Sequence, residues 1–299
     1  MQASESSNDH LGATRRRPVD LAILSDLHLG TYGCHADELL AYLLSIQPGR
    51  LILNGDVIDI WQFNKRYWPV SHMQVIEEIV SLMGDGVPVY YLTGNHDDVL
   101  RRFSDVDLGD FHLRDKLLLE IDGKRHWIFH GDVFDASIHH MRWLARLGGR
   151  GYDALIRINR GVNAALQAMG QPRRSFSKRI KQGVKRAVKV VGDFERCAAE
   201  LAIERGYDYV ICGHIHVPQR RVIRDAQGRQ VVYLNSGDWV ESLTALEYHG
   251  GRWHIYRHDK SAVPSLPVAR DRLPSGAGTP LDRVAMVGQG LLDLRIDTR

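Results

Sequence analysis

The chain has 299 residues, 44% of them hydrophobic, which is enough to form one large α/β domain or two smaller ones. No apolar run approaches the ~20 residues that a membrane-spanning helix needs, and the polar N-terminus does not resemble a secretory signal. The three cysteines have no close spacing, which argues against a disulfide framework or a zinc knuckle and favours reduced thiols in a cytosolic protein.

The net charge of +3 is unevenly distributed along the chain. The segment from Ser137 to Gly192 contains 13 Lys and Arg residues and a single acidic residue, Asp153. This segment therefore carries +12 and the rest of the chain −9. Such asymmetry predicts a partner that carries phosphates, either a membrane surface or a nucleic acid.

Five short apolar runs each end in a cluster of polar residues. In chain order the runs and clusters are Leu21–Leu24 before Ser25-Asp26, Leu51–Leu53 before Asn54-Gly55-Asp56, Val87–Leu92 before Thr93-Gly94-Asn95-His96, Trp127–Phe129 before His130-Gly131-Asp132, and Tyr209–Cys212 before Gly213-His214-Ile215-His216. Helical patterns over His35–Ile46 and His72–Met83 lie between them. This alternation predicts an α/β fold in which strands are covered on both faces and ligands bind beyond the strands' carboxyl ends.

A later series of apolar runs predicts antiparallel strands that close a second sheet. The runs are Val231–Leu234, Leu243–Tyr248 and Trp253–Tyr256.

Three segments fall outside this pattern. Residues 1–17 are polar and predicted to be disordered, so the folded domain is expected over residues 18–260. Residues 136–205 are basic and helical in pattern, and they are predicted to form a helical cap inserted above the site. Residues 261–299 are rich in Pro and Gly and are expected to form a flexible C-terminal tail.

The strand-end clusters contain residue types that bind transition metals. Asp26 and His28 are two residues apart, as are His214 and His216, so each pair can direct both side chains toward one cation. Further carboxylate, amide and imidazole groups come from Asp56, Asn95 and His130. This mixture suits Mn²⁺, Fe or Zn²⁺ better than the all-oxygen site of Ca²⁺.

Each cluster taken alone also fits a structural role. An Asp after a strand is commonly a turn or a helix cap, and a single His is commonly part of the packing. Five clusters, each at the end of a predicted strand, are not explained in this way. Together they predict a metal centre at one edge of the sheet.

The five motifs resemble those of calcineurin-like metallophosphoesterases and stand in the same order between residues 20 and 256. They are Asp26-Leu27-His28, Gly55-Asp56-Val57-Ile58-Asp59, Gly94-Asn95-His96-Asp97, His130-Gly131-Asp132 and Gly213-His214-Ile215-His216. The resemblance implies an α/β fold that is a four-layer αββα sandwich of two packed sheets with helices outside.

The resemblance also implies two divalent cations. One would be bound by Asp26, His28, Asp56 and His216. The other would be bound by Asp56, Asn95, His130 and His214, with Asp56 as the bridge. The resemblance further implies that His96 is the catalytic histidine and that Asp59 orients it. The alternative role of Asp59 is a helix-start cap.

Two cations about 3.5–4 Å apart can clamp the attacking and leaving oxygens at phosphorus and lower the pKa of a bound water. No Ser or Cys nucleophile is then required. The metals and His96 would stabilise the negative charge of the transition state, and His96 could assist the leaving group. The chain is therefore expected to be a metal-dependent hydrolase of phosphoric esters or pyrophosphates.

Within the superfamily, the segments Ser25–Gly30 and Gly55–Trp61 and a helical insertion after His130 are similar to the UDP-2,3-diacylglucosamine diphosphatases of lipid A biosynthesis. This similarity implies Mn²⁺ and hydrolysis of UDP-2,3-diacylglucosamine, or a related lipid-linked nucleotide, to UMP and a lipid monophosphate. It also implies a cytoplasmic protein on the inner face of the cytoplasmic membrane. That family has arginine after the ligand asparagine, where this chain has His96, as phosphoesterases in general do.

The basic segment offers contacts for such a substrate. From Phe176 to Val191, apolar residues at near-helical spacing alternate with six Lys and Arg residues. This pattern predicts an interfacial helix on anionic lipid or a cap helix with a solvated basic face. Guanidinium groups suit phosphate oxygens and an aromatic ring can line a pocket or pack on its rim, so the candidate substrate contacts are Arg157, Arg160, Arg173, Arg174 and Trp61.

Other functions are alternatives. A nuclease or a phospholipid-cleaving phosphodiesterase would use the same metal site, although Phe176 is the single aromatic of the densest basic stretch, which argues against nucleic acid as the partner. A phosphoprotein phosphatase would need an open groove, which the predicted cap disfavours. A non-enzymatic interaction module would be expected to lose ligands, and none is missing.

Overall fold

The computed structural model describes residues 16–61, 67–134, 192 and 194–259, which all belong to one compact unit. Most of the predicted cap and tail, including Arg157, Arg160, Arg173 and Arg174, lies outside these residues. At the N-terminal side, β1 (Arg17–Val19) begins one residue before the boundary expected at residue 18. Within the part of the chain that is described, no helix has the length and apolar character needed to cross a membrane.

The larger of the two main sheets has seven strands in the order β14-β13-β2-β4-β5-β7-β6. Its parallel centre consists of β2 (Leu21–Leu24), β4 (Leu51–Asn54), β5 (Val89–Leu92) and β7 (Phe111–Arg114). The antiparallel strands at its two sides are β13 (Thr244–His249), β14 (Arg252–Arg257) and β6 (Val106–Leu108). Every residue of β2 and β4 is buried, as expected of strands that are covered on both faces.

The smaller main sheet has five strands in the order β11-β12-β10-β9-β8. They are β8 (Lys116–Ile121), β9 (Lys124–Phe129), β10 (Tyr209–Cys212), β11 (Gln219–Arg224) and β12 (Gln230–Asn235). The central strand β10 is parallel to both of its neighbours, β9 and β12. Apart from the two main sheets, β1 pairs in parallel with β3 (Ile46–Pro48).

The prediction that the last three strands close one second sheet is wrong in part. β12 joins the five-stranded sheet, whereas β13 pairs with β2 in the larger sheet, with Leu246 opposite Ile23, and β14 pairs with β13. An alternating apolar pattern indicates a strand, but it does not specify which of two sheets supplies the partner, because partner choice depends on distant residues.

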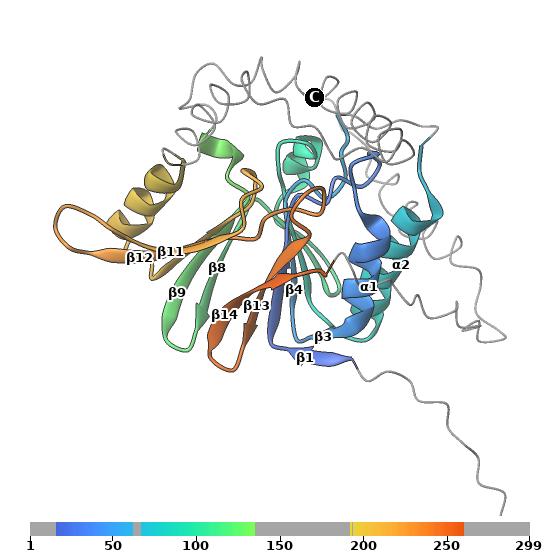
Figure 1. Ribbon diagram of the computed structural model, residues 1–299, viewed down its shortest axis with the longest axis horizontal. Helices are drawn as coiled ribbons and strands as arrows, with labels where there is room; N and C mark the ends of the chain where they lie inside the picture. Colours follow the sequence, from blue (N-terminus) through green and yellow to red (C-terminus); the bar gives the residue numbers. More distant parts are fainter. Residues whose placement is uncertain (1–15, 62–66, 135–191, 193, 260–299) are drawn as a thin grey trace, which may run out of the picture. The chain divides into compact units, whose positions relative to one another are not determined.

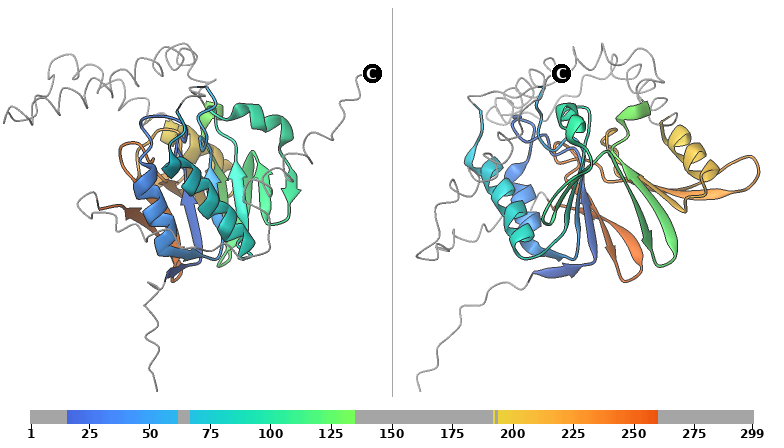
Figure 2. Two further views of the ribbon diagram at one scale, coloured as in Figure 1. Left: turned by 90° about the vertical axis from the view of Figure 1, so that its right-hand side faces the viewer. Right: turned by 180° about the vertical axis from the view of Figure 1, so that it is seen from behind.

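Helices cover the outer face of each main sheet, so the fold has four layers (Figures 1 and 2). α1 (Ala36–Ser45) and α2 (Val70–Gly84) cover the larger sheet, and their buried residues at helical spacing include Leu39, Leu43, Val75, Ile79 and Leu82. The sequence patterns predicted both helices to within two residues. The four-layer αββα sandwich is confirmed.

Residues 194–204 form a helix that belongs to this framework. Phe194, Ala198 and Ala202 pack in one buried cluster with Trp127 and Phe129 of β9, on the outer face of the five-stranded sheet. This stretch lies within residues 136–205, the segment that the sequence pattern predicts to be the inserted cap. Its small apolar residues are explained by close packing on the sheet.

The two faces of β2 contribute to different cores. Ala22 and Leu24 pack with α1 and α2, whereas Leu21 and Ile23 pack in the core between the two main sheets. This division follows from the two-residue period of a strand. The carboxyl ends of strands from both sheets lie at one edge of the sandwich, where the polar clusters begin.

His126 of β9 links the two sheets and provides a test of their packing. Its Nδ1 donates to the Lys124 carbonyl at 2.9 Å, its Nε2 accepts from Trp253 Nε1 at 3.1 Å, and its ring stacks on Tyr209. Burial lowers the pKa of His126, so the folded chain holds this imidazole neutral.

Because the unfolded chain binds this proton more readily, the contribution of His126 to stability is present above about pH 6.5 and is lost as the pH falls below it. We expect the free energy of unfolding of His126→Gln to depend less on pH than that of the unsubstituted chain between about pH 5 and 7. Urea unfolding at several pH values measures this difference. Identical pH profiles would show that His126 does not titrate with unfolding.

Candidate metal centre and active site

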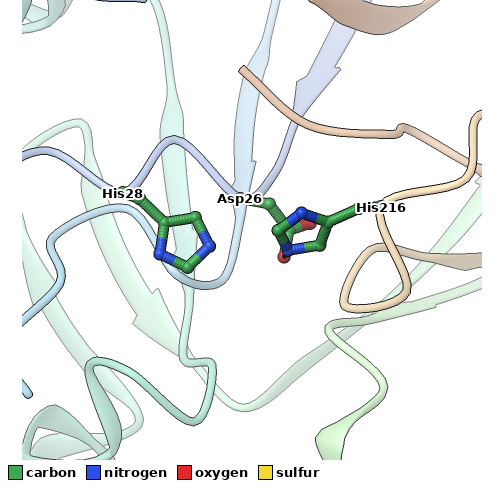
Figure 3. A group of neighbouring side chains, drawn as sticks. All are labelled: Asp26, His28 and His216. Carbon is green, nitrogen blue, oxygen red and sulfur yellow. Dashed lines mark ion pairs between the residues drawn. The ribbon is translucent and has the colours of Figure 1, made fainter. Parts of the chain in front are cut away.

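The predicted ligands gather at the carboxyl ends of β2, β4, β5, β9 and β10. Three overlapping groups of side chains place their potential ligand atoms within 4.8 Å of one another. The groups are Asp26 with His28 and His216, His28 with Asp56 and His96, and Asp56 with His130 and His214. In Figure 3, the His216 ring reaches from its loop to Asp26, and His28 lies beside them. Segments far apart in the sequence thus form one centre.

Five of the predicted ligands have a left-handed backbone conformation. Their φ angles are 53° at Asp26, 50° at His28, 53° at Asp56, 68° at His214 and 56° at His216. This conformation is unfavourable for residues other than Gly, costing about 1–3 kcal/mol each, and it concentrates at functional sites. Backbone hydrogen bonds hold the first two loops together, from Asp26 N to Gly55 O at 3.0 Å and from His28 N to Asp56 O at 2.9 Å.

Two carboxylates are each fixed through one oxygen and present the other to histidines. Asp26 Oδ2 accepts from the His214 N–H at 3.0 Å, and Asp56 Oδ1 accepts from the His96 N–H at 2.8 Å. Asp26 Oδ1 then lies 3.1 Å from His216 Nε2, and Asp56 Oδ2 lies 3.3 Å from His130 Nε2. One oxygen of each carboxylate therefore faces the ligand cluster.

Glycines allow the loops to approach these carboxylates. A Cβ atom at Gly213 would lie 2.6 Å from Asp26 Oδ2, and one at Gly94 would collide with Asp56 Oδ1. Both positions precede a predicted ligand, and this explains why glycine stands at them.

Several buried ligand atoms have no hydrogen-bond partner among the described residues. They are Asp26 Oδ1, His28 Nε2, Asn95 Oδ1 and His130 Nε2. Leaving such atoms unpaired costs free energy, and divalent cations would satisfy all four. In two of these histidines the other ring nitrogen faces an oxygen, which leaves Nε2 turned toward the cluster. His130 Nδ1 lies 2.8 Å from the Asn54 carbonyl, and His28 Nδ1 lies 3.2 Å from Asp59 Oδ2. These residues fit a dinuclear metal centre.

His96 lies next to this cluster with its ring held by Asp59. Its Nδ1 is 2.9 Å from Asp59 Oδ1, and its Nε2 is 3.9 Å from Asp56 Oδ2. Burial disfavours charge on both groups, but His28 and His96 outweigh it and lower the pKa of Asp59 to about 2, and Asp59 and Asp56 outweigh it and raise the pKa of His96. Asp59 is fully buried and contacts His28 as well, so one carboxylate orients a predicted ligand and the predicted catalytic base or acid.

Trp61 lies against the other side of this arrangement. Its ring centroid is 4.8 Å from that of His96, its Nε1 donates to Asp98 Oδ1 at 3.4 Å, and 44% of the residue is exposed. Of the five predicted substrate contacts, Trp61 is the one within the described residues, and it borders the site.

A family comparison agrees with this geometry: the sequence model of the calcineurin-like phosphoesterases matches residues 19–218. The chain belongs to the calcineurin-like phosphoesterase family. It is a metal-dependent phosphoester hydrolase by family, and its mixed sheets and outer helices have that family's α/β character.

Curated relatives of this phosphoesterase include proteins named UDP-2,3-diacylglucosamine hydrolase. The one from Stenotrophomonas maltophilia strain K279a is 26% identical over 240 residues, which cover 78% of this chain and 96% of the relative. The one from Chromobacterium violaceum is 26% identical over 254 residues, which cover 82% and 97%. A solved dimetal phosphatase from Danio rerio is 15% identical, covers 80% of this chain and 96% of its own, and has a TM-score of 0.39.

Protons compete with metals for two of the histidines of this phosphoesterase. Burial alone would lower the pKa of His216, but Asp26, Asp238 and Asp56 outweigh it and raise the pKa to about 9. In the same way, Asp56 and Asp26 outweigh burial and raise the pKa of His130 well above its ordinary value. Both rings therefore hold a proton near neutral pH when no cation is bound.

Because a cation binds the deprotonated ring, we expect metal binding to release protons and to tighten as the pH rises from about 6 to 8. Calorimetric titrations with Mn²⁺ in two buffers of different ionisation enthalpy measure the number of protons released. An affinity that is constant over this range would contradict the expectation.

Arg101 and Asp238 contact residues of the motifs, although neither is among the site residues predicted from the sequence. Arg101 of η1 (Asp98–Phe103) donates to Asp132 Oδ2 at 2.9 Å, at the start of η2 (Asp132–Phe134), and so joins the loops that follow β5 and β9. Asp238 lies behind His216. The signal for Asp238 was present, because Ser236-Gly237-Asp238 is a further polar cluster directly after a strand that runs parallel to β10.

Proposed function

We propose that the chain hydrolyses the pyrophosphate of a lipid-linked nucleotide, with UDP-2,3-diacylglucosamine as the first candidate, to UMP and a lipid monophosphate. The observation that carries the proposal is the joined cluster of six predicted ligands and His96, with Asp56 common to two of its groups. The choice of substrate is supported by relatives named UDP-2,3-diacylglucosamine hydrolase. The one from Aliivibrio fischeri is 21% identical over 81% of the chain, and the one from Chromobacterium violaceum is 26% identical over 82%.

The side chains define roles in this reaction. Asp26, His28, Asp56 and His216 would hold one cation and Asp56, Asn95, His130 and His214 the other, and the cations would supply Lewis-acid stabilisation of the phosphoryl oxygens and an acidified water. His96, with Nδ1 held by Asp59 and Nε2 facing the cluster, is suited to donate a proton to the leaving phosphate.

Exposed apolar side chains in the segments that carry the metal-site motifs favour a substrate with a lipid part. They follow the strand-end motifs closely in sequence and are defined here as the apolar rim, consisting of Ile60, Trp61, Val99, Phe103, Val133 and Val217. Exposed apolar groups near a polar site are typical of binding surfaces for amphipathic ligands, and the ring of one of them, Trp61, lies 4.8 Å from that of His96.

The cofactor and the location are parts of the same proposal. Mn²⁺ is the proposed metal, because the ligands combine imidazole, carboxylate and amide groups. The charge of +12 between Ser137 and Gly192 supports attachment to an anionic membrane surface, which would place the protein peripherally on the inner face of the cytoplasmic membrane.

The test is to incubate the Mn²⁺-loaded full chain with UDP-2,3-diacylglucosamine in detergent micelles and to measure UMP and the lipid monophosphate. Bis-p-nitrophenyl phosphate serves as a general phosphodiester, and Asp56→Ala serves as the inactive control. Release of UMP that Asp56→Ala abolishes supports the proposal. Cleavage of the nitrophenyl ester alone would retain the metal site and reject the substrate.

A further inference from the structure

The predicted ligand His216 has charged groups on both sides of its ring. Its Nε2 lies 3.1 Å from Asp26 Oδ1 inside the metal cluster, and its Nδ1 lies 3.9 Å from Asp238 Oδ2. The second distance exceeds that of a direct hydrogen bond, so the interaction is an electrostatic attraction. A carboxylate on the far side of a metal-binding imidazole fixes the orientation and tautomer of the ring.

Asp238 is itself rigidly held. It is fully buried, and its Oδ1 accepts from the backbone N–H groups of Val240, Glu241 and Ser242. Its Oδ2 accepts from the Ser242 hydroxyl at 2.8 Å and also faces His216. The turn is thus stabilised mainly through Oδ1, and it does not require a negative charge on Oδ2.

The loop that carries Asp238 is hydrogen-bonded to two of the three loops that would supply ligands of the first cation, namely those that carry Asp26 and His216. Trp239 N donates to the Asp26 carbonyl at 3.1 Å, and Asn235 Nδ2 donates to the Gly213 carbonyl at 2.7 Å. The hydroxyl groups of Ser25 and Ser236 form a hydrogen bond of 2.6 Å. The Asp238 carboxylate therefore has a fixed place relative to Asp26 and His216.

We propose that Asp238 is a positioning residue of the metal centre, which orients His216 and directs its Nε2 toward the cation. The proposal rests on the dinuclear centre and does not depend on the identity of the substrate. An asparagine at this position retains an oxygen for the three N–H groups but removes the charge beside His216. We therefore attribute the effect on metal binding to the negative charge of Asp238 and not to its role in the turn.

The experiment compares Asp238→Asn and Asp238→Ser with the matched control Ser242→Ala in the full chain. Ser242→Ala removes the hydroxyl partner of Asp238 from the same turn and leaves the carboxylate in place. Calorimetric titration of each metal-free protein with Mn²⁺ gives the affinities of the two sites. Thermal unfolding of the metal-free proteins reports whether the turn is intact.

We expect Asp238→Asn and Asp238→Ser to weaken one of the two Mn²⁺ sites about 10- to 100-fold, and Ser242→Ala to bind Mn²⁺ like the unsubstituted chain. Unchanged Mn²⁺ affinity in both Asp238 variants would overturn the proposal. Equal losses in Ser242→Ala would overturn it as well, because they would assign the effect to the turn. No substrate enters this measurement, so its result is independent of the proposed lipid-linked reaction.

Discussion

Replacing Asp56 by Asn is expected to lower kcat/KM by about a thousandfold or more and to weaken binding at both metal sites. Asp56 Oδ2 lies within reach of His130, His28 and His96, and Oδ1 is fixed by the His96 N–H. Asparagine keeps the shape but removes the negative charge that the two cations would share. Lewis-acid stabilisation is worth several kcal/mol, and each 1.36 kcal/mol corresponds to about a tenfold change in rate.

The measurement combines phosphodiester hydrolysis with the metal content of the dialysed protein. Asp85→Asn is the matched control, since Asp85 is exposed at the end of α2 that precedes β5, away from the carboxyl-end loops. Full activity of Asp56→Asn with two bound metals would refute the bridging role.

Replacing His96 by Ala is expected to lower kcat by about 100- to 10,000-fold while the protein still binds two metals. The reason is its position: Asp59 holds Nδ1, and Nε2 faces the cluster without being one of the seven predicted ligands. A proton donor matters most for a poor leaving group. The loss should therefore be larger for an alkyl phosphodiester, whose alkoxide leaving group is strongly basic, than for a p-nitrophenyl ester, whose leaving group needs little protonation.

The comparison of the two substrates distinguishes two roles of His96. Equal losses on both would show that it stabilises charge on phosphorus and does not protonate the leaving group. Asp59→Asn should be measured beside His96→Ala, because Asp59 contacts His28 as well as His96. This variant should weaken metal binding and slow the reaction, whereas His96→Ala should affect the rate alone.

The residue types of the site could be predicted because they follow directly from the local sequence pattern. A strand that is covered on both faces needs an apolar run, and the polar residues that follow it, such as Asp26 and His28 after β2, lie at the edge where parallel strands end. The same local signal predicted α1 and α2. It also singled out Asp26, His28, Asp56 and the other side chains that the structure brings together from five separate loops.

Tertiary structure decided what depends on distant partners. The sequence could not specify that β13 joins β2, that the helix over residues 194–204 covers the smaller sheet, or that the Asp238 loop lies behind His216. Nor did the sequence indicate that the Asp59 carboxylate contacts the ring of His28 as well as that of His96. Residue type and spacing define which groups a chain can offer to a metal or a phosphate. Their distances follow only from the packing of the two sheets and their loops, which places Asp26 and Asp238 on opposite sides of the His216 ring.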